Sequence, residues 1–375
     1  MLVTLSPMLP LAPTATVGPL PPDRPRPKRR RWIYLVVAMG TFVLAVIGAA
    51  VVPVPYVALR PGSVRPVTEQ VLVEGAPSYP PGESIAYTTV SVGPTTLLEA
   101  LVGWLDDDVD VLPEENVRGG RTEEENRRYN AQLMDTSKLS AVAVALDHLG
   151  EEVEIRTSGT VVRQIAKGSP AAAALELDDV IVAVDGEAVD VPDEIGQLLQ
   201  VGGPGVEHTL VVERPAGSAA QTEVVVTTVA ADDDAERAII GIAPEERIIG
   251  FDFPIEVTID SGTVGGPSAG LAFTLAVLDV LTPGELTGGR RVAVTGTMAL
   301  DGTVGPVGGG AQKAITVRDS GYEVFLVPSA ELVEVQEAVG DGLHVIAVDT
   351  LVEALEALDS LGGNAGSLRT AYTPS

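Results

Sequence analysis

The sequence predicts a multi-domain chain in which an N-terminal transmembrane helix precedes a β-rich domain and a C-terminal α/β domain. Residues 32–52 carry no charge, residues 157–230 hold short apolar strands separated by turns, and residues 236–361 alternate strands with helices. The length of 375 residues suits two or three domains of about 150 residues each.

The N-terminal segment has the composition of a tail followed by a membrane anchor. Residues 1–31 contain eight prolines and a basic run, so we expect a disordered tail. Residues 32–52 are 21 residues long, enough at about 1.5 Å each to cross a hydrocarbon layer of about 30 Å. Six basic residues precede this stretch, and Asp23 is the only acidic residue alongside them. The positive-inside rule therefore predicts a cytoplasmic N-terminus and a single-pass chain whose remainder lies outside the cytoplasmic membrane.

A cleaved signal peptide is the alternative for this segment. Gly48, Ala49 and Ala50 form a small-residue cleavage site. The apolar stretch is longer than the usual core of about 7–15 residues, which favours an uncleaved anchor in contact with membrane lipids.

Composition excludes several classes of function. Asp and Glu number 52 against 24 Lys and Arg, a net charge of -28, which argues against nucleic acid as a partner. Cysteine is absent and only three histidines occur, so thiol catalysis, disulfides and most zinc chemistry are excluded. We expect no cofactor and no metal. The acidic stretch 106–110 reads as a solvated loop, because the spaced Gly and Glu of a calcium loop do not follow.

Residues 56–150 are predicted as a β region followed by a long helix. Strands are expected at 71–73 and 85–92, and good helix formers run from 123 to 149, where Gly150 ends them. Nothing in this region suggests chemistry.

Residues 157–230 resemble a PDZ domain. The resemblance rests on residues 167–171 (KGSPA), 177–181 (LDDVI) and 184–186 (VDG). Asp178 stands where the family usually has Gly. The resemblance implies capture of extended peptides or chain ends by strand addition, although no clear carboxylate-binding loop is identified. A purely structural spacer is the alternative.

The α/β domain, residues 236–361, contains two unusual glycine-rich segments. In the first, Gly266, Pro267, Ser268 and Ala269 lead into an apolar helix, where a hydroxyl faces unpaired N–H groups that can stabilise an oxyanion. Read alone, such a serine is more often an N-cap. The second segment, GGGAQKA, places Lys313 in the first turn of a predicted helix at 310–319, where burial and the positive helix end would lower its pKa.

Together these segments resemble the Lon-type serine proteases with a Ser-Lys dyad. The resemblance covers about 120 residues, including GPSAG at 266–270, TGTMALDGTVGPVGG at 295–309, Lys313 and Val327-Pro328. It implies that Ser268 is the nucleophile, that Lys313 is its base, 45 residues further along, and that Thr295 hydrogen-bonds the Lys amine. Gly265 and Thr297 depart from the family, which often has Asp and Glu there.

Beyond residue 32 the chain resembles the membrane-anchored, PDZ-containing Lon-like proteins of bacteria. No P-loop motif occurs in the sequence, so the resemblance implies an ATP-independent endopeptidase acting on unfolded or flexible proteins, with peptide segments held at the PDZ domain. It also implies assembly with further copies of the chain. The Gly-, Ser- and Thr-rich residues 362–375 are predicted to be a disordered tail.

Other classes of protein share single features with this sequence. Residues 257–263 (VTIDSGT) look like an aspartic protease loop, with Asp319 in a second copy, but that Asp follows a helix rather than a strand. Trypsin-like proteases with PDZ domains need a His-Asp-Ser triad and place the protease before the PDZ domain, the reverse of the order here. Membrane metalloproteases need His-Glu-x-x-His, which is absent. The remaining alternative is a non-catalytic membrane-anchored PDZ adaptor whose Lon-like domain only binds peptides.

Overall fold

The computed structural model describes Gly18, residues 29–79, Gly82, and residues 85–106, 108–214, 221–231 and 233–368. Of the two predicted disordered tails, 1–31 lies mostly outside these residues, and 362–375 lies outside them from residue 369 onward. Within them, residues 29–31 already belong to a helix, and residues 365–367 form a 3-10 turn.

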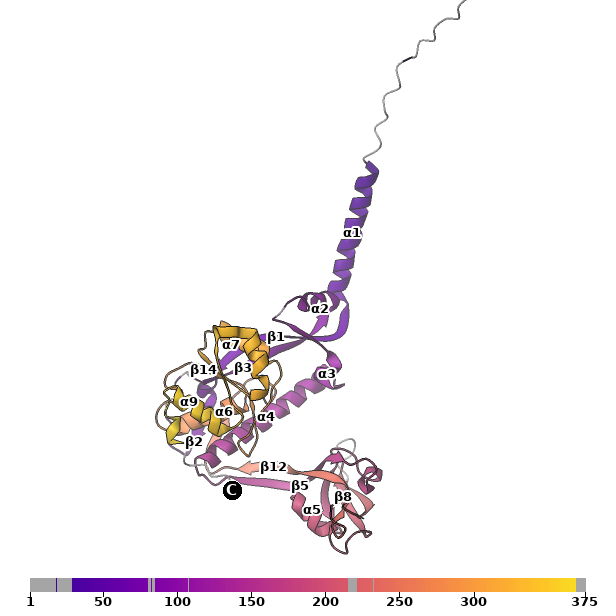
Figure 1. Cartoon of the computed structure of the whole chain (residues 1–375), viewed down its shortest axis with the longest axis vertical. Coiled ribbons are helices and arrows are strands. Elements are labelled where there is room, and N and C mark those ends of the chain that lie inside the picture. Colours follow the sequence, from indigo (N-terminus) through magenta and orange to yellow (C-terminus); the bar gives the residue numbers. More distant parts are fainter. Residues whose placement is uncertain are drawn as a thin grey trace, which may run out of the picture.

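The N-terminal helix α1 (Arg29–Val51) stands apart from the rest of the chain (Figure 1). Its apolar part, Trp32–Val51, has a mean hydropathy of 2.4 and buries no residue against the protein. Its length and composition suit a membrane span, and a signal sequence has the same two properties.

A six-stranded mixed sheet forms the centre of the α/β domain, in the order β18-β17-β14-β3-β1-β4. The four strands β3, β14, β17 and β18 are parallel, whereas β1 is antiparallel to both of its neighbours. The strands are β1 (Pro53–Pro66), β3 (Ile85–Thr96), β4 (Asp110–Pro113), β14 (Val292–Val294), β17 (Val324–Val327) and β18 (His344–Ala347).

Helices cover both faces of this sheet. Val292 and Val294 of β14 pack on one face with α4 (Glu123–His148), α6 (Gly270–Leu281) and α9 (Leu351–Ser360). Ala293 points to the opposite face, onto α7 (Gly310–Asp319) and α8 (Leu332–Val339). This alternation is the period-two pattern of a strand buried on both sides.

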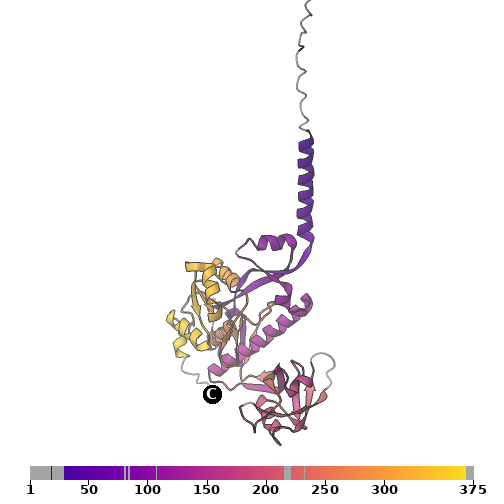
Figure 2. The same ribbon diagram turned by 45° about the vertical axis from the view of Figure 1, so that its right-hand side comes forward.

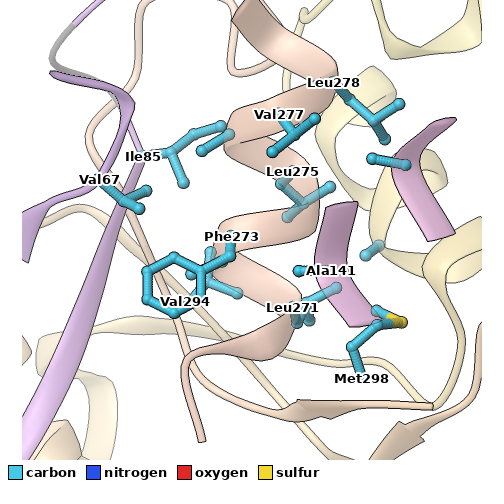
Figure 3. Packing of buried hydrophobic residues seen from close by; sticks show 14 of the residues in the cluster. Val67, Ile85, Ala141, Leu271, Phe273, Leu275, Val277, Leu278, Val294 and Met298 are labelled. Carbon is cyan, nitrogen blue, oxygen red and sulfur yellow. The ribbon is translucent and has the colours of Figure 1, made fainter. Parts of the chain in front are cut away.

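Helix α6 packs against the sheet and is buried along nearly its whole length (Figure 3). Every residue from Gly270 to Val280 is buried, and Phe273 packs beside Val294 while Ala141 of α4 closes the other side. A helix that is apolar all round needs such an environment. The loop just before α6, which contains Ser268, is therefore attached to a helix that the core holds in place.

Residues 56–150 share this sheet and core with the C-terminal part of the chain rather than forming a region of their own. Ile85, Ala86 and Tyr87 of β3 pair with β14, and β2 (Val71–Glu74) pairs with β13 (Glu256–Ile259). The α/β domain is thus assembled from two segments, one on each side of the PDZ-like region. Pairing over such a sequence distance leaves no local pattern, which is why the sequence boundaries differ from the structure.

The PDZ-like region is an insertion with its own sheet and core, spanning Glu154 to Asp252. Its last strand, β12 (Ile242–Asp252), pairs with its first, β5 (Glu154–Ile165), so the region reaches beyond the expected limit of residue 230. The two strands also form the connection to the α/β domain (Figure 1). The other elements are β6 (Val180–Val184), β7 (Glu187–Ala188), α5 (Pro192–Leu199), β8 (Glu207–Glu213), β9 (Thr222–Thr227), β10 (Val229–Ala230) and β11 (Ala238–Ile239).

Asp178, the departure from the PDZ pattern, has a left-handed backbone. Its φ is 68°, a conformation that Gly adopts freely and that Asp tolerates better than most residues. Its neighbour Asp179 is fully buried and accepts the Glu176 N–H at 2.9 Å. Asp178 thus adopts a turn conformation that Gly would also accept.

Candidate active site

The candidate site lies at the carboxyl end of β14, where residues from the two faces of the sheet approach each other. Thr295 follows β14 directly and continues the ladder through its N–H to Leu326 O, 3.0 Å away. Ser268 precedes α6 on one face and Lys313 lies in the first turn of α7 on the other. The carboxyl ends of parallel strands are the usual place for a site in an α/β sheet.

Contacts with α4 and β15 (Thr297–Met298) fix the loop that carries Ser268. Gly266 has a φ of 94° and donates its N–H to Asn130 O at 2.8 Å, and Ser137 Oγ donates to Pro267 O at 3.1 Å. A Cβ on Gly270 would lie 2.7 Å from the backbone nitrogen of Met298. Glycine is therefore required at the first residue of α6.

The backbone around Ser268 presents free donors. Its carbonyl accepts Gly296 N–H at 2.9 Å and Thr295 Oγ1–H at 3.2 Å. Among the described residues no acceptor takes the N–H of Ser268 or of Ala269, which is the N-cap of α6. Two N–H donors at the start of a helix suit a developing negative charge beside the half-buried Ser268.

Lys313 is buried, and its side chain has one hydrogen-bond partner among the described residues. Its side chain is 2% exposed, and Nζ donates to Thr295 Oγ1 at 3.1 Å. Burial lowers the pKa of Lys313 from 10.5 to about 8, while the charge of Glu331 acts in the opposite direction. A pKa of about 8 leaves a minor fraction of the amine unprotonated at neutral pH, and that fraction can accept a proton.

Glu331 is the acidic side chain that acts on this lysine. It is buried, and its Oε1 accepts Val307 N–H at 2.9 Å in the loop before α7. Its Oε2 has no hydrogen-bond partner within the described part of the chain. Among the described residues this side chain forms no ion pair with Lys313, although it lies beside the start of α7.

The structure brings together the six residues that the sequence singled out, with Thr295 as the link. Ser268 and Lys313, both in the described part of the chain, share no direct hydrogen bond; Thr295 joins Nζ of one to the carbonyl of the other. Gly266, Pro267 and Ala269 shape the loop around Ser268. Hydrogen bonds between nucleophile and base are often long without substrate.

The two aspartates of the aspartic-protease alternative do not form a shared site. Asp260 is exposed and accepts Gly262 N–H at 2.9 Å, and Asp319 is exposed at the end of α7, paired with Arg318 at 3.0 Å. That chemistry needs two carboxylates sharing one proton. No hydrogen bond joins these two described residues.

Three residues around the site were not found by sequence reasoning. Asn130 and Ser137 lie on α4, for which no chemistry was expected, and Glu331 lies after β17. The signal on α4 is a stripe with Asn130, Met134, Ser137 and Ala141 at spacings of three and four, the face that packs against α6. For Glu331 the sequence holds no signal.

Comparisons with known proteins agree with this geometry. Residues 250–359 match the family described as Lon protease (S16) C-terminal proteolytic domain, and residues 161–214 match the PDZ domain family. The chain is 32% identical to Lon protease of Clostridioides difficile over 171 residues, which are 42% of this chain and 21% of that protein. It is 29% identical to Lon protease 2 of Bacillus subtilis over 119 residues, 32% of this chain and 20% of that protein.

Solved structures were matched in the PDZ-like region. The PDZ domain of an SdrC-like protein from Listeria monocytogenes is 20% identical, with a TM-score of 0.22, over 24% of this chain and 92% of that one. The chain spans about a fifth of the length of the Lon proteases above. Within this chain, residues 161–214 belong to a PDZ domain and residues 250–359 to a proteolytic domain of the Lon serine peptidase family.

Proposed function

We propose that this chain is an ATP-independent serine endopeptidase in which Ser268 is the nucleophile and Lys313 the general base. The observation that carries the proposal is the buried Lys313, whose Nζ reaches Thr295 and through it the Ser268 carbonyl. A buried lysine without an ion pair costs stability. We attribute this cost to catalysis, because a lysine with a lowered pKa near a serine at a helix start can act as the base that activates it.

The proposed reaction has two halves. Neutral Lys313 takes the Ser268 proton as Oγ attacks the substrate carbonyl carbon, and the protonated amine then gives that proton to the leaving nitrogen as the peptide bond breaks. Water, deprotonated by the neutral amine, attacks the acyl carbon; the bond from that carbon to Oγ then breaks, and the protonated amine returns its proton to Ser268 Oγ. The free N–H groups of Ser268 and Ala269 hold the oxyanion in both halves.

The sequence lacks a P-loop, so ATP would not drive unfolding, and the expected substrates are unfolded or flexible proteins. The PDZ domain would hold extended peptide segments by strand addition, as a docking or a regulatory site. Assembly with further copies is part of the same proposal by analogy with the family.

We also propose that α1 anchors the chain in the cytoplasmic membrane. The basic residues before Trp32 keep the N-terminus in the cytoplasm and place both domains outside. The anchor would confine the protease to the membrane surface.

The test compares four full-length proteins in detergent, on casein without ATP: wild type, Ser268→Ala, Lys313→Arg and the matched control Ser320→Ala, at an exposed serine after α7. Wild type and the control should cleave, whereas Ser268→Ala and Lys313→Arg should not, because a guanidinium stays charged. A serine-directed covalent probe should label wild type and leave Ser268→Ala unlabelled.

The adaptor alternative predicts a different pattern. A folded wild-type protein that neither cleaves casein nor accepts the probe is the result that favours a peptide-binding adaptor. Full activity of Lys313→Arg would instead remove the lysine from the mechanism.

A further inference from the structure

A patch of exposed apolar side chains lies at the foot of the N-terminal helix. It belongs to α2 (Leu97–Gly103) and the two residues that follow it, and its exposed members are Leu97, Leu101, Val102, Trp104 and Leu105. Trp104 is 57% exposed and Leu105 88% exposed. Such a concentration of large apolar groups on so short a segment marks a contact surface.

The opposite face of α2 is fixed to the domain. Ala100 is buried, and a Cβ on Gly103 would lie 2.7 Å from a methyl carbon of Val111 in β4. A capping box between Thr96 and Glu99 holds the start of the helix. The patch is therefore displayed on a supported helix, not on a loose loop.

The patch begins where the apolar span ends. Leu97 donates its N–H to Val52 O at 3.0 Å, and Pro53 pairs with Thr96 in the first register position of β1 and β3. Both views place α2 beside the lower end of α1, and Figure 2 shows it lying crosswise to that helix. A helix placed so would lie along the membrane surface if α1 crosses the membrane.

The side chains have the chemistry of a membrane interface. Leu97, Leu101 and Trp104, at spacings of four and three, share one side of α2. The Trp104 ring packs edge-on against Tyr56, with centroids 5.8 Å apart, and Trp and Tyr are enriched where headgroups meet acyl chains. The carboxylates that follow Leu105, Asp106 and Asp108, are exposed and disfavour a contact driven by anionic lipid.

We infer that α2 and Trp104–Leu105 form a second membrane contact, in which the apolar side of α2 inserts among the headgroups and upper acyl chains of the bilayer that α1 crosses. This inference rests on the membrane anchor proposed above. Two contacts on one bilayer would fix the orientation of the α/β domain, because a single helix leaves the domain free to swing. The active site would then keep a constant direction relative to the membrane.

The chain has two tryptophans, Trp32 and Trp104, which allows a direct test. The full-length Trp32→Phe protein is reconstituted into vesicles of zwitterionic lipid, with or without bromine at shallow or deep acyl positions. Trp104 emission should be blue-shifted, shielded from acrylamide, and reduced about twofold or more by shallow bromines and less by deep ones. Raising the salt concentration should change none of this, because the contact is apolar.

Charge placed in the patch should abolish the contact. In the Trp32→Phe background, Leu101→Glu with Leu105→Glu should lose bromine quenching, whereas Val333→Glu, at an exposed apolar residue of α8, should keep it. Unchanged circular dichroism and thermal unfolding would show that all the variants fold.

Each other outcome overturns the inference. Emission that acrylamide quenches freely, in protein that still floats with vesicles after alkaline extraction, leaves the anchor intact and removes the second contact. Shielding from acrylamide without bromine quenching identifies a protein surface, such as a second copy, as the occupant. Loss of flotation rejects the anchor and the second contact together.

Discussion

Lys313 Nζ lies 3.1 Å from Thr295 Oγ1 across the carboxyl edge of β14. The threonine hydroxyl has one proton, and it donates that proton to the Ser268 carbonyl at 3.2 Å. Toward Lys313 it must therefore be an acceptor, so an amine N–H occupies this contact. The nitrogen lone pair of a neutral Lys313 then points away from Thr295, and in the mechanism proposed above it accepts the proton of the Ser268 hydroxyl.

Thr295→Val should lower kcat about a hundredfold with little change in KM, because it removes the acceptor that orients the amine. Thr295→Ser keeps the hydroxyl and should keep most of the activity. Kinetics on a fluorogenic peptide measure both parameters. Wild-type kcat in the valine variant would show that Thr295 only packs.

The pH dependence of kcat/KM should report the lysine. With the pKa of Lys313 lowered to about 8, the reactive neutral form increases about tenfold per pH unit below that value and levels off above it. The rate should therefore rise with pH and reach a plateau above about 8. A rate that is flat between pH 6 and 9 would contradict a titrating base.

Glu331→Gln should move that profile toward lower pH. The Glu331 charge raises the pKa of Lys313 against the effect of burial, so a neutral amide leaves burial unopposed. The amide oxygen can still accept Val307 N–H. Glu334→Gln is the matched control, because Glu334 is exposed and its Oε1 accepts Ala311 N–H at 3.0 Å in the same helix start. A shared shift in both variants would assign the effect to α7 rather than to Glu331.

Local patterns in the sequence predicted two of the helices closely. The bounds of α7 are those expected, and α4 ends one residue earlier than expected. These segments have strong caps or glycine ends, which act within a few residues. The two glycine-rich segments that place Ser268 and Lys313 are local in the same sense.

Strand β1 could not be predicted, because four prolines interrupt its pattern: Pro53, Pro55, Pro61 and Pro66. Its pairing with β3 shifts register between Val54 and Val57 and between Pro61 and Val64. Such bulges accommodate residues that lack an N–H. The contact of Asn130 with the Ser268 loop depends on the same long-range assembly, which no short window of sequence contains.

Asp178→Ala should destabilise the PDZ domain by about 1 kcal/mol, whereas Asp178→Gly should not. The backbone φ of 68° is strained for a residue with a Cβ and no polar side chain. The ion pair of Asp178 with Arg163 is exposed on both sides and is lost in both variants, so the difference isolates the backbone. Hydrogen exchange of the β6 amides measures it, and equal exchange in the two variants would contradict the strain.

Lys313→Met should make the α/β domain more stable at pH 7 while abolishing cleavage. Below pH 8 the lysine is protonated in the folded and unfolded chain, and burying that charge costs up to about 3 kcal/mol for a pKa lowered from 10.5 to about 8. Met fills a similar volume without the charge, so we expect a gain of about 1–3 kcal/mol.

The gain should shrink as the pH rises from about 8 to 10.5. Over this range the folded chain holds a neutral amine while the unfolded chain remains protonated, so the stability of the wild type increases with pH. Thermal unfolding of both full-length proteins across this range measures the effect. Lys138→Met, at a partly exposed lysine of α4 that pairs with Asp135, should change stability by no more than about 0.5 kcal/mol at any pH. A Met variant less stable than wild type at pH 7 would contradict this prediction. It would mean that Lys313 stabilises the folded chain and that its burial does not lower the free energy of unfolding.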